Sequence, residues 1–154
     1  MLLPLSGDRT PIPFAQSKFN EVAGRFSPNG AWIAYASDES GRSEIYVKAF
    51  PRSDTGVIVS RGGGSEPRWG PGGTELFYLD PDGFLTVVKV SPAVKFNYEA
   101  PQRLFQIHVP LFGGIFGTNY DVAKDGRILV NTLVGRAAPK PITVVVNWTA
   151  GLKK

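Results

Sequence analysis

Two arginines stand at equivalent places in the sequence, each directly before a large aromatic residue. Arg25 precedes Phe26 in the stretch GRFSPNGAWIAY, and Arg68 precedes Trp69 in PRWGPGGTELFY, 43 positions further on. A guanidinium group presents several N–H donors in a planar fork that matches carboxylates and phosphates. If the repeated segments are arranged around an axis, both side chains could line the central channel along it. There they could receive an anion or an acidic peptide, so Arg25 and Arg68 are our candidate binding residues.

A repeated salt bridge between neighbouring units is the alternative role for these arginines, because Glu21 and Glu66 lie close to them in the sequence. Alternation along a strand points each arginine away from the aromatic residue that follows it. We therefore expect Arg68 to keep contact with solvent at the lip of the channel, while Trp69 is buried. On this basis, replacing Arg68 by alanine should destabilise the protein much less than replacing Trp69.

No set of residues predicts catalysis, a metal or a cofactor. His108 is the only histidine, and the chain has no cysteine. A Ser-His-acid triad needs a nucleophile held in a strained turn such as Gly-x-Ser-x-Gly, but GGGSEP has Pro67 in place of the last glycine. We therefore interpret His108 as a loop or half-buried structural residue. A single histidine also argues against a histidine-rich zinc site.

Three further motifs have simpler structural interpretations. Asp80 and Asp82 are close carboxylates, but a calcium loop needs a third alternate oxygen ligand and a distant Glu. Asp82 is followed at once by Gly83, which predicts a turn. The stretch RGGGS at 61–65 lacks the Gly-Lys-Ser/Thr of a phosphate-binding loop, so we expect a turn into a strand. The glycosylation sequon at 147–149 falls within a predicted strand and is interpreted as coincidence.

The composition is that of a globular chain of 154 residues, with 42% hydrophobic residues and a net charge of +4. Its lysines and arginines are scattered rather than gathered into a stripe, which argues against nucleic-acid binding. No apolar run approaches the ~18 residues that span a bilayer, so no membrane insertion is predicted. The start, MLLPLSGDRT, is too short and too weakly basic for a secretory signal. As written the chain is expected in the cytoplasm; within a longer bacterial chain it could lie outside.

Strand signals dominate the sequence, and helix signals are nearly absent. Runs of β-branched and aromatic residues alternate with turn sequences that contain proline, asparagine, aspartate and glycine. The runs are AWIAYAS, TELFYLD, FLTVVKV, RILVNTLV and ITVVVNW, and the turns are SPNG, GPGG, DPDG and KDG. These patterns predict an all-β fold.

The 43-residue offset predicts a repeated unit of four antiparallel strands, which is the length of one propeller blade. We expect a blade over 21–60, a second over 61–108, and a third over 109–154 that lacks its outer strand. Residues 1–20 are expected to form the outer strand of a preceding blade and a linker. Phe26 and Trp69 are expected to fill the same place between adjacent sheets.

Compared with the first two units, the third unit has a shorter turn and a longer connection preceding it. YDVAKDGRILV aligns Val122 with the two aromatic anchors and Gly126 with Gly30 and Gly73, with one residue missing after the turn. The extra length lies in HVPLFGGIFGTN, which we interpret as a connection between blades, a binding or active-site lid being the alternative.

The phrases FSPNGAWIAY and WGPGGTELFY resemble the TolB-like, WD-repeat-like β-propeller repeats, with Asn29 and Gly72 where the family usually has Asp. The resemblance covers almost the whole chain. The sequence is similar to the C-terminal end of propellers fused to bacterial serine/threonine protein kinases, although no kinase motif occurs in this sequence. The resemblance implies a ring of about six blades, of which this chain would hold three.

The sequence is therefore interpreted as a partial β-propeller that serves as a non-catalytic binding or sensing module. The alternative is an accessory domain of a larger enzyme, either a serine/threonine kinase or a prolyl-oligopeptidase-type peptidase. Expected partners are a protein or peptide, or the remaining blades of a parent chain. A homodimer could also close the ring if each chain lent residues 2–5 to the other's strand at 142–148; simple truncation is the competing explanation.

Overall fold

The computed structural model describes residues 1–14, 17–51, 55–92, 95–108, 118–132 and 144–145. The described residues form strands, turns and one short 3-10 turn, Pro71–Gly73, and none of them forms an α-helix. The predicted all-β class is confirmed. No helix among these residues has the length and apolar character needed to cross a membrane.

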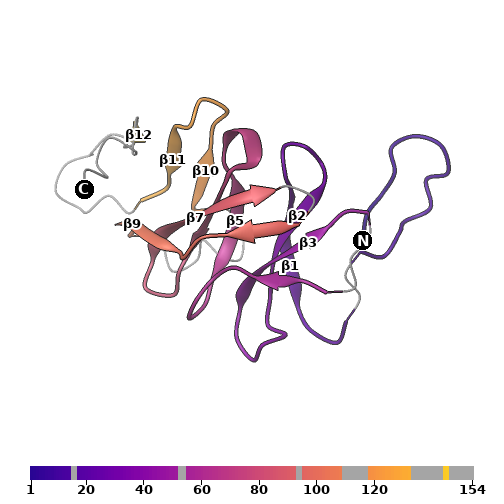
Figure 1. The fold of residues 1–154 in the computed structure, drawn as a ribbon, viewed down its shortest axis with the longest axis horizontal. Helices are drawn as coiled ribbons and strands as arrows, with labels where there is room; N and C mark the ends of the chain where they lie inside the picture. The colour runs from indigo at the N-terminus through magenta and orange to yellow at the C-terminus, as the bar shows by residue number, and fades with distance from the viewer. Residues whose placement is uncertain (15–16, 52–54, 93–94, 109–117, 133–143, 146–154) are drawn as a thin grey trace.

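The strands form three antiparallel sheets in chain order (Figure 1). The first sheet contains β1 (Glu21–Phe26), β2 (Trp32–Ser37), β3 (Glu44–Ala49) and β4 (Val57–Ile58). The second contains β5 (Ser65–Trp69), β6 (Glu75–Leu79), β7 (Phe84–Pro92), β8 (Phe96–Tyr98) and β9 (Gln102–Gln106). The third contains β10 (Tyr120–Val122), β11 (Ile128–Val130) and β12 (Val144–Val145). Within each sheet, every pair of neighbouring strands is antiparallel.

The second sheet differs from the predicted four-stranded unit because β7 is long and has two partners on one side. Its first half pairs with β9, and its end pairs with β8. The extra strand β8 brings Phe96 into the core, where its ring lies 5.1 Å from Trp32 and 6.5 Å from Trp69. The sequence analysis missed β8 because its three residues are too few to show alternation.

One turn recurs between the first and second strands of all three sheets. Gly30, Gly73 and Gly126 have φ of 70°, 73° and 84°, a conformation that glycine adopts at little steric cost. Each amide donates to the carbonyl three residues earlier, at 2.8, 3.1 and 2.9 Å. In the third sheet the closing bond runs from Ala123 N to Arg127 O, one residue sooner than in the other two, as the alignment predicted.

The second sheet buries both of its faces. We call the face toward the first sheet its leading face and the face toward the third sheet its trailing face. The leading face packs with the first sheet in a core made of Ala34, Ala36, Ile45, Val47, Val59, Trp69, Leu76, Tyr78, Val88, Val90 and Phe96. The trailing face packs with the third sheet in a core made of Phe77, Leu79, Leu85, Val87, Ile107, Tyr120, Ile128 and Val130.

The two aromatic anchors have different surroundings. Trp69 is 9% exposed, and its indole Nε1 donates to the Arg25 carbonyl at 3.0 Å, which ties the second sheet to β1. Phe26 is 50% exposed and packs edge-to-face on Phe50, with ring centroids 5.2 Å apart. The expectation of two equivalent buried anchors is therefore wrong for Phe26, because no other sheet of the described residues packs on that face of the first sheet.

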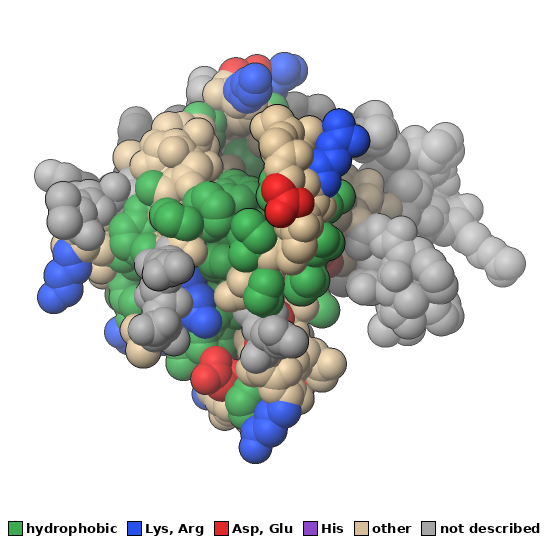
Figure 2. Space-filling view, turned by 90° about the vertical axis from the view of Figure 1, so that its right-hand side faces the viewer, with side chains coloured by type: hydrophobic (Ala, Val, Ile, Leu, Met, Phe, Trp, Pro, Cys, Tyr) green, Lys and Arg blue, Asp and Glu red, His purple; other side chains and the backbone are tan. Residues whose placement is uncertain are grey.

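The N-terminal residues cover part of the face of the first sheet that points away from the second sheet, which we call the leading face of the first sheet. Leu2 and Phe14 pack against Ile33, Tyr35 and Tyr46, which are buried. The segment is held by a single antiparallel bridge between Leu2 and Ile12. Residues 2–5 therefore do not form a strand beyond this one bridge. Figure 2, which views this end of the molecule, shows hydrophobic side chains gathered over the centre of the face.

We expect the two anchors to differ in their contribution to stability. Trp69→Ala should lower the free energy of unfolding by about 3–5 kcal/mol, because it empties the core between two sheets. Phe26→Ala should cost about 1 kcal/mol, because half of that side chain already meets water. Urea melts of the two variants measure the difference. Equal losses would show that the first and second sheets do not pack through Trp69.

Candidate functional site

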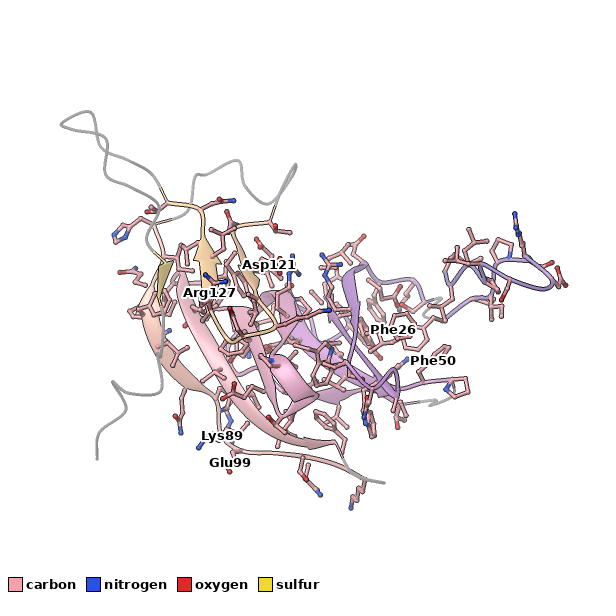
Figure 3. The ribbon with its side chains drawn as sticks, turned by 90° about the horizontal axis from the view of Figure 1, so that it is seen from above. Phe26, Phe50, Lys89, Glu99, Asp121 and Arg127 are labelled. Atoms are coloured by element: carbon pink, nitrogen blue, oxygen red, sulfur yellow. The ribbon has the colours of Figure 1, made fainter. Side chains whose placement is uncertain are left out.

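The first strands of the three sheets, β1, β5 and β10, lie next to one another in that order. Arg25, Arg68 and Asp121 occupy the same repeat position on these strands, directly before Phe26, Trp69 and Val122. All three line one cleft of about 480 Å³. The other lining residues are Phe26, Pro28, Trp69 and Thr118. The two arginines predicted from the sequence therefore line the same cleft, and Asp121, which is labelled in Figure 3, lines it with them.

A β-bulge at the same place in β1 and β5 sets the direction of each arginine. Three residue steps on β1, from Val22 to Arg25, oppose two steps on β2, and the same shift occurs between Ser65 and Arg68. Ala23 and Glu66 within these bulges have φ of 57° and 53°. Residues other than glycine rarely adopt this backbone conformation. Such bulges change the direction in which neighbouring side chains point. The repeated bulge thus places both guanidinium groups at the cleft.

Arg68 is buried, which corrects the expectation that it keeps contact with solvent. The residue is 7% exposed. Its Nη1 donates to the Pro67 carbonyl at 2.9 Å, and its guanidinium lies 5.9 Å from the centre of the Tyr120 ring. Its Nε is 3.6 Å from Asp121 Oδ1, and the Asp121 side chain is 69% exposed. The third sheet covers Arg68, because β10 packs beside β5.

The predicted alternative partners, Glu21 and Glu66, do not pair with the arginines among the described residues. The Glu66 carboxylate accepts from Asn119 N at 2.8 Å and from Asn119 Nδ2 at 2.5 Å. Its backbone carbonyl accepts from the Tyr120 hydroxyl at 2.6 Å. Glu21 accepts from the Ser17 hydroxyl. The repeated salt bridge to these glutamates is therefore wrong, and Glu66 instead joins the second sheet to the third.

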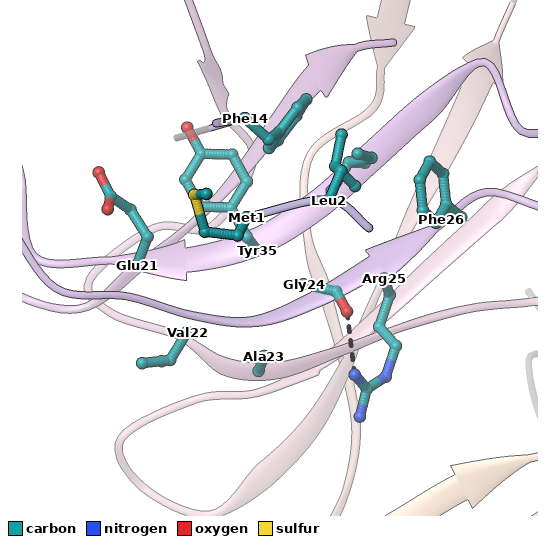
Figure 4. A pocket seen from close by; sticks show the side chains of 11 residues that line it. Met1, Leu2, Phe14, Glu21, Val22, Ala23, Gly24, Arg25, Phe26 and Tyr35 are labelled. Carbon is teal, nitrogen blue, oxygen red and sulfur yellow. Dashed lines mark hydrogen bonds between the residues drawn. The ribbon is translucent and has the colours of Figure 1, made fainter. Parts of the chain in front are cut away.

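Arg25 is half-buried, and no carboxylate among the described residues forms an ion pair with it. Its Nη1 donates to the Gly24 carbonyl at 2.9 Å (Figure 4). Burial and the positive charge of Arg68 lower the pKa of Arg25 from its ordinary value, and Asp121 partly offsets this effect. The charged guanidinium is therefore less well solvated and less well paired than an exposed arginine. Such a group gains from an anion placed beside it.

The other candidate groups have structural partners. Asp80 Oδ1 accepts from Asp82 N at 3.0 Å and from Phe84 N at 2.9 Å, as expected for a turn. Arg103 bridges both aspartates. In the 61–65 stretch, which was compared with a phosphate-binding loop, the Gly63 amide donates to the Glu44 carboxylate at 3.0 Å. This amide is therefore paired with a carboxylate of the protein itself.

His108 lies exposed after the end of β9. Within the described ranges, no group of three or more His, Cys, Asp or Glu residues could hold a metal ion. Residues 109–117 of the stretch HVPLFGGIFGTN, interpreted as a connection between blades or alternatively as a lid, lie outside the described residues. The sequon at 147–149 and the strand residues 142–143 and 146–148 invoked for ring closure also lie outside them.

Asp121 was not among the site residues predicted from the sequence, although the alignment of the third unit contained the signal. Aligning Val122 with the aromatic anchors places Asp121 at the arginine position of the third unit. An acidic residue where two units have arginine balances part of the positive charge at the cleft. A charge reversal at a repeated position is the pattern that would have revealed it.

No protein-family model matches this chain, and a search of curated proteins also found no match.

Replacement of Arg68 and Asp121 tests the burial at the cleft. Arg68→Ala should lower the free energy of unfolding by about 2–4 kcal/mol, because it removes a buried side chain whose guanidinium lies over the Tyr120 ring. Asp121→Ala should cost less than about 1 kcal/mol, because an ion pair with an exposed carboxylate contributes little. Thermal and urea unfolding measure both values. A loss from Arg68→Ala no greater than that from Asp121→Ala would place Arg68 at the surface.

Proposed function

We propose that the chain is a partial β-propeller, about three blades of a ring of roughly six, as the resemblance to TolB-like repeats suggests. Three observations support this arrangement. The sheets follow one another face to face, the same glycine turn recurs in all three, and the same bulge recurs in the first two. The first strands of neighbouring sheets also contact one another, as strands nearest a propeller axis are expected to do.

We further propose that the chain acts as a non-catalytic binding module for a protein or peptide. The observation that carries this proposal is the cleft between the first strands, where one residue position from each of three sheets meets. Its volume of about 480 Å³ suits a few residues of a peptide. Loops and strand ends remain free to bind there while the sheet faces are occupied by packing.

The NMR spectrum of the protein tests where a ligand binds. Acidic, basic and neutral hexapeptides are added separately to ¹⁵N-labelled protein. We expect at least one of them to shift the amides of Arg25, Arg68 and Trp69. Thr118→Trp, which fills the cleft from an exposed position, should abolish those shifts. Val57→Trp on the distant strand β4 is the matched control and should leave them unchanged. Shifts centred elsewhere, or none with any peptide, would contradict the proposal.

The alternative function is that of an accessory domain within a larger enzyme, a serine/threonine kinase or a prolyl-oligopeptidase-type peptidase. The apolar leading face of the first sheet favours it. Two hollows of about 380 and 820 Å³ lie there, lined largely by apolar residues such as Leu2, Phe14 and Phe26. Further blades of a parent chain would cover this face, and so would the third sheet of a second copy, whose Leu129 is 49% exposed.

A complementation experiment separates these two ways of covering the face. If two copies associate head to tail, Phe26→Lys and Leu129→Lys should each give a monomer, because a charge enters each apolar contact. Their mixture should regain a dimer, since one of its two interfaces then carries no lysine. Sedimentation velocity measures the species. A wild-type chain that stays monomeric or aggregates without a discrete dimer would support the remaining blades of a parent chain instead.

A further inference from the structure

The charges of the described residues that line the cleft are unbalanced. Arg25 and Arg68 both line it, and Asp121 is the carboxylate that the described lining provides. Asp121 pairs with Arg68 at 3.6 Å, at the long end of ion-pair contact, and Arg25 has only the Gly24 carbonyl as a hydrogen-bond partner among the described residues. Two cations therefore share one distant carboxylate.

We propose that this cleft binds a carboxylate side chain of an acidic peptide, which Arg25 receives and Arg68 shares. The proposal rests on the cleft being the binding site, as proposed above, and adds the chemical class of its ligand. A guanidinium group has five N–H donors in a planar fork. Carboxylates match this fork with two parallel hydrogen bonds. The half-buried position of Arg25 strengthens such a pair, because water screens it less than it would at an open surface.

Asp121 acts in this arrangement as an internal competitor. It lies at the repeat position where the other two units have arginine, and its carboxylate is already within ion-pair distance of Arg68. Its Oδ1 also accepts a hydrogen bond from Val122 N at 2.9 Å. Because most of its side chain is exposed, Asp121 can exchange the long Arg68 contact for water when another carboxylate arrives. The structure therefore predicts that removing this charge makes the protein bind the ligand more tightly.

The lining distinguishes a peptide carboxylate from an inorganic anion. Phe26, Pro28 and Trp69 supply apolar surface beside the two arginines. Such surface can pack on the methylene groups that carry a glutamate carboxylate, whereas phosphate has none. Glu66 and Asp121 also add negative charge near Arg25. A dianion is disfavoured by that charge more than a single carboxylate is.

Titration with two neutral-ended tripeptides tests the ligand class. Acetyl-Glu-Glu-Glu-amide is compared with acetyl-Gln-Gln-Gln-amide by calorimetry, and the shifts of the cleft amides in the NMR spectrum provide a second signal from the cleft itself. The acidic peptide should bind at least tenfold more tightly, and its affinity should fall as salt rises. Arg25→Gln should weaken it by about 10- to 100-fold, the range for a hydrogen bond to a charged group. Arg25→Lys should fall in between, because it keeps the charge without the fork.

Two further variants provide the controls. Asp121→Asn should tighten binding of the acidic peptide several-fold. Arg127→Gln removes an exposed arginine that pairs with Asp125 away from the cleft lining, and it should leave the affinity unchanged. The melting temperature of each variant shows that it folds before its affinity is compared.

The outcomes separate this inference from the proposed function. Equal affinity for the Glu and Gln peptides, with cleft amides still shifting in the NMR spectrum, would overturn the carboxylate assignment and leave the binding site intact. Inorganic phosphate that binds as tightly as the acidic peptide, with the same dependence on Arg25, would show a general anion site and would also overturn it. Weaker binding in Asp121→Asn would contradict the role given to Asp121. Absence of any cleft shift would reject both proposals.

Discussion

The packing of each sheet against the next is the constraint on which the rest of this structure depends. An antiparallel sheet of apolar strands has two faces to cover, and the second sheet covers both by lying between two others. Trp69 is central to this arrangement, because its ring enters the core while its Nε1–H reaches the Arg25 carbonyl on β1. A buried indole N–H requires such a partner. The bond therefore fixes the first strands of two sheets side by side, beyond what apolar contact alone would specify.

The cleft follows from this packing. When sheets stack through their faces, their first strands meet along one edge, and the residues that point past the core meet there too. The bulges at Ala23 and Glu66 turn the following arginines toward that edge. The cost of the unusual backbone at Glu66 is offset in part by the bonds its carboxylate accepts from Asn119 on the way into β10. The same residues that join the second sheet to the third thus also shape the binding cleft.

The buried and half-buried charges of the described residues considered above divide into two kinds. Glu44 and Asp80 are buried and accept several hydrogen bonds from turns and arginines of their own sheets, so they hold loops in place. A buried charge with such partners is a structural feature, because its solvation by water has been replaced. Arg25 and Arg68 are different, since one lacks an ion pair among the described residues and the other has a weak one. This contrast is what makes the cleft, rather than the other charged clusters, the place to look for a ligand.

The sequence by itself determined the all-β class, the positions of the main strands and the three recurrent turns. It could do so because these features depend on local properties, namely the alternation of apolar residues and the positive φ that Gly30, Gly73 and Gly126 supply. The tertiary structure alone decided that Trp69 is buried while Phe26 is half exposed, and that Arg68 is covered. A repeat makes equivalent residues look alike in sequence, but their burial depends on which neighbouring sheet packs on them, and among the described residues a second sheet covers Trp69 but not Phe26.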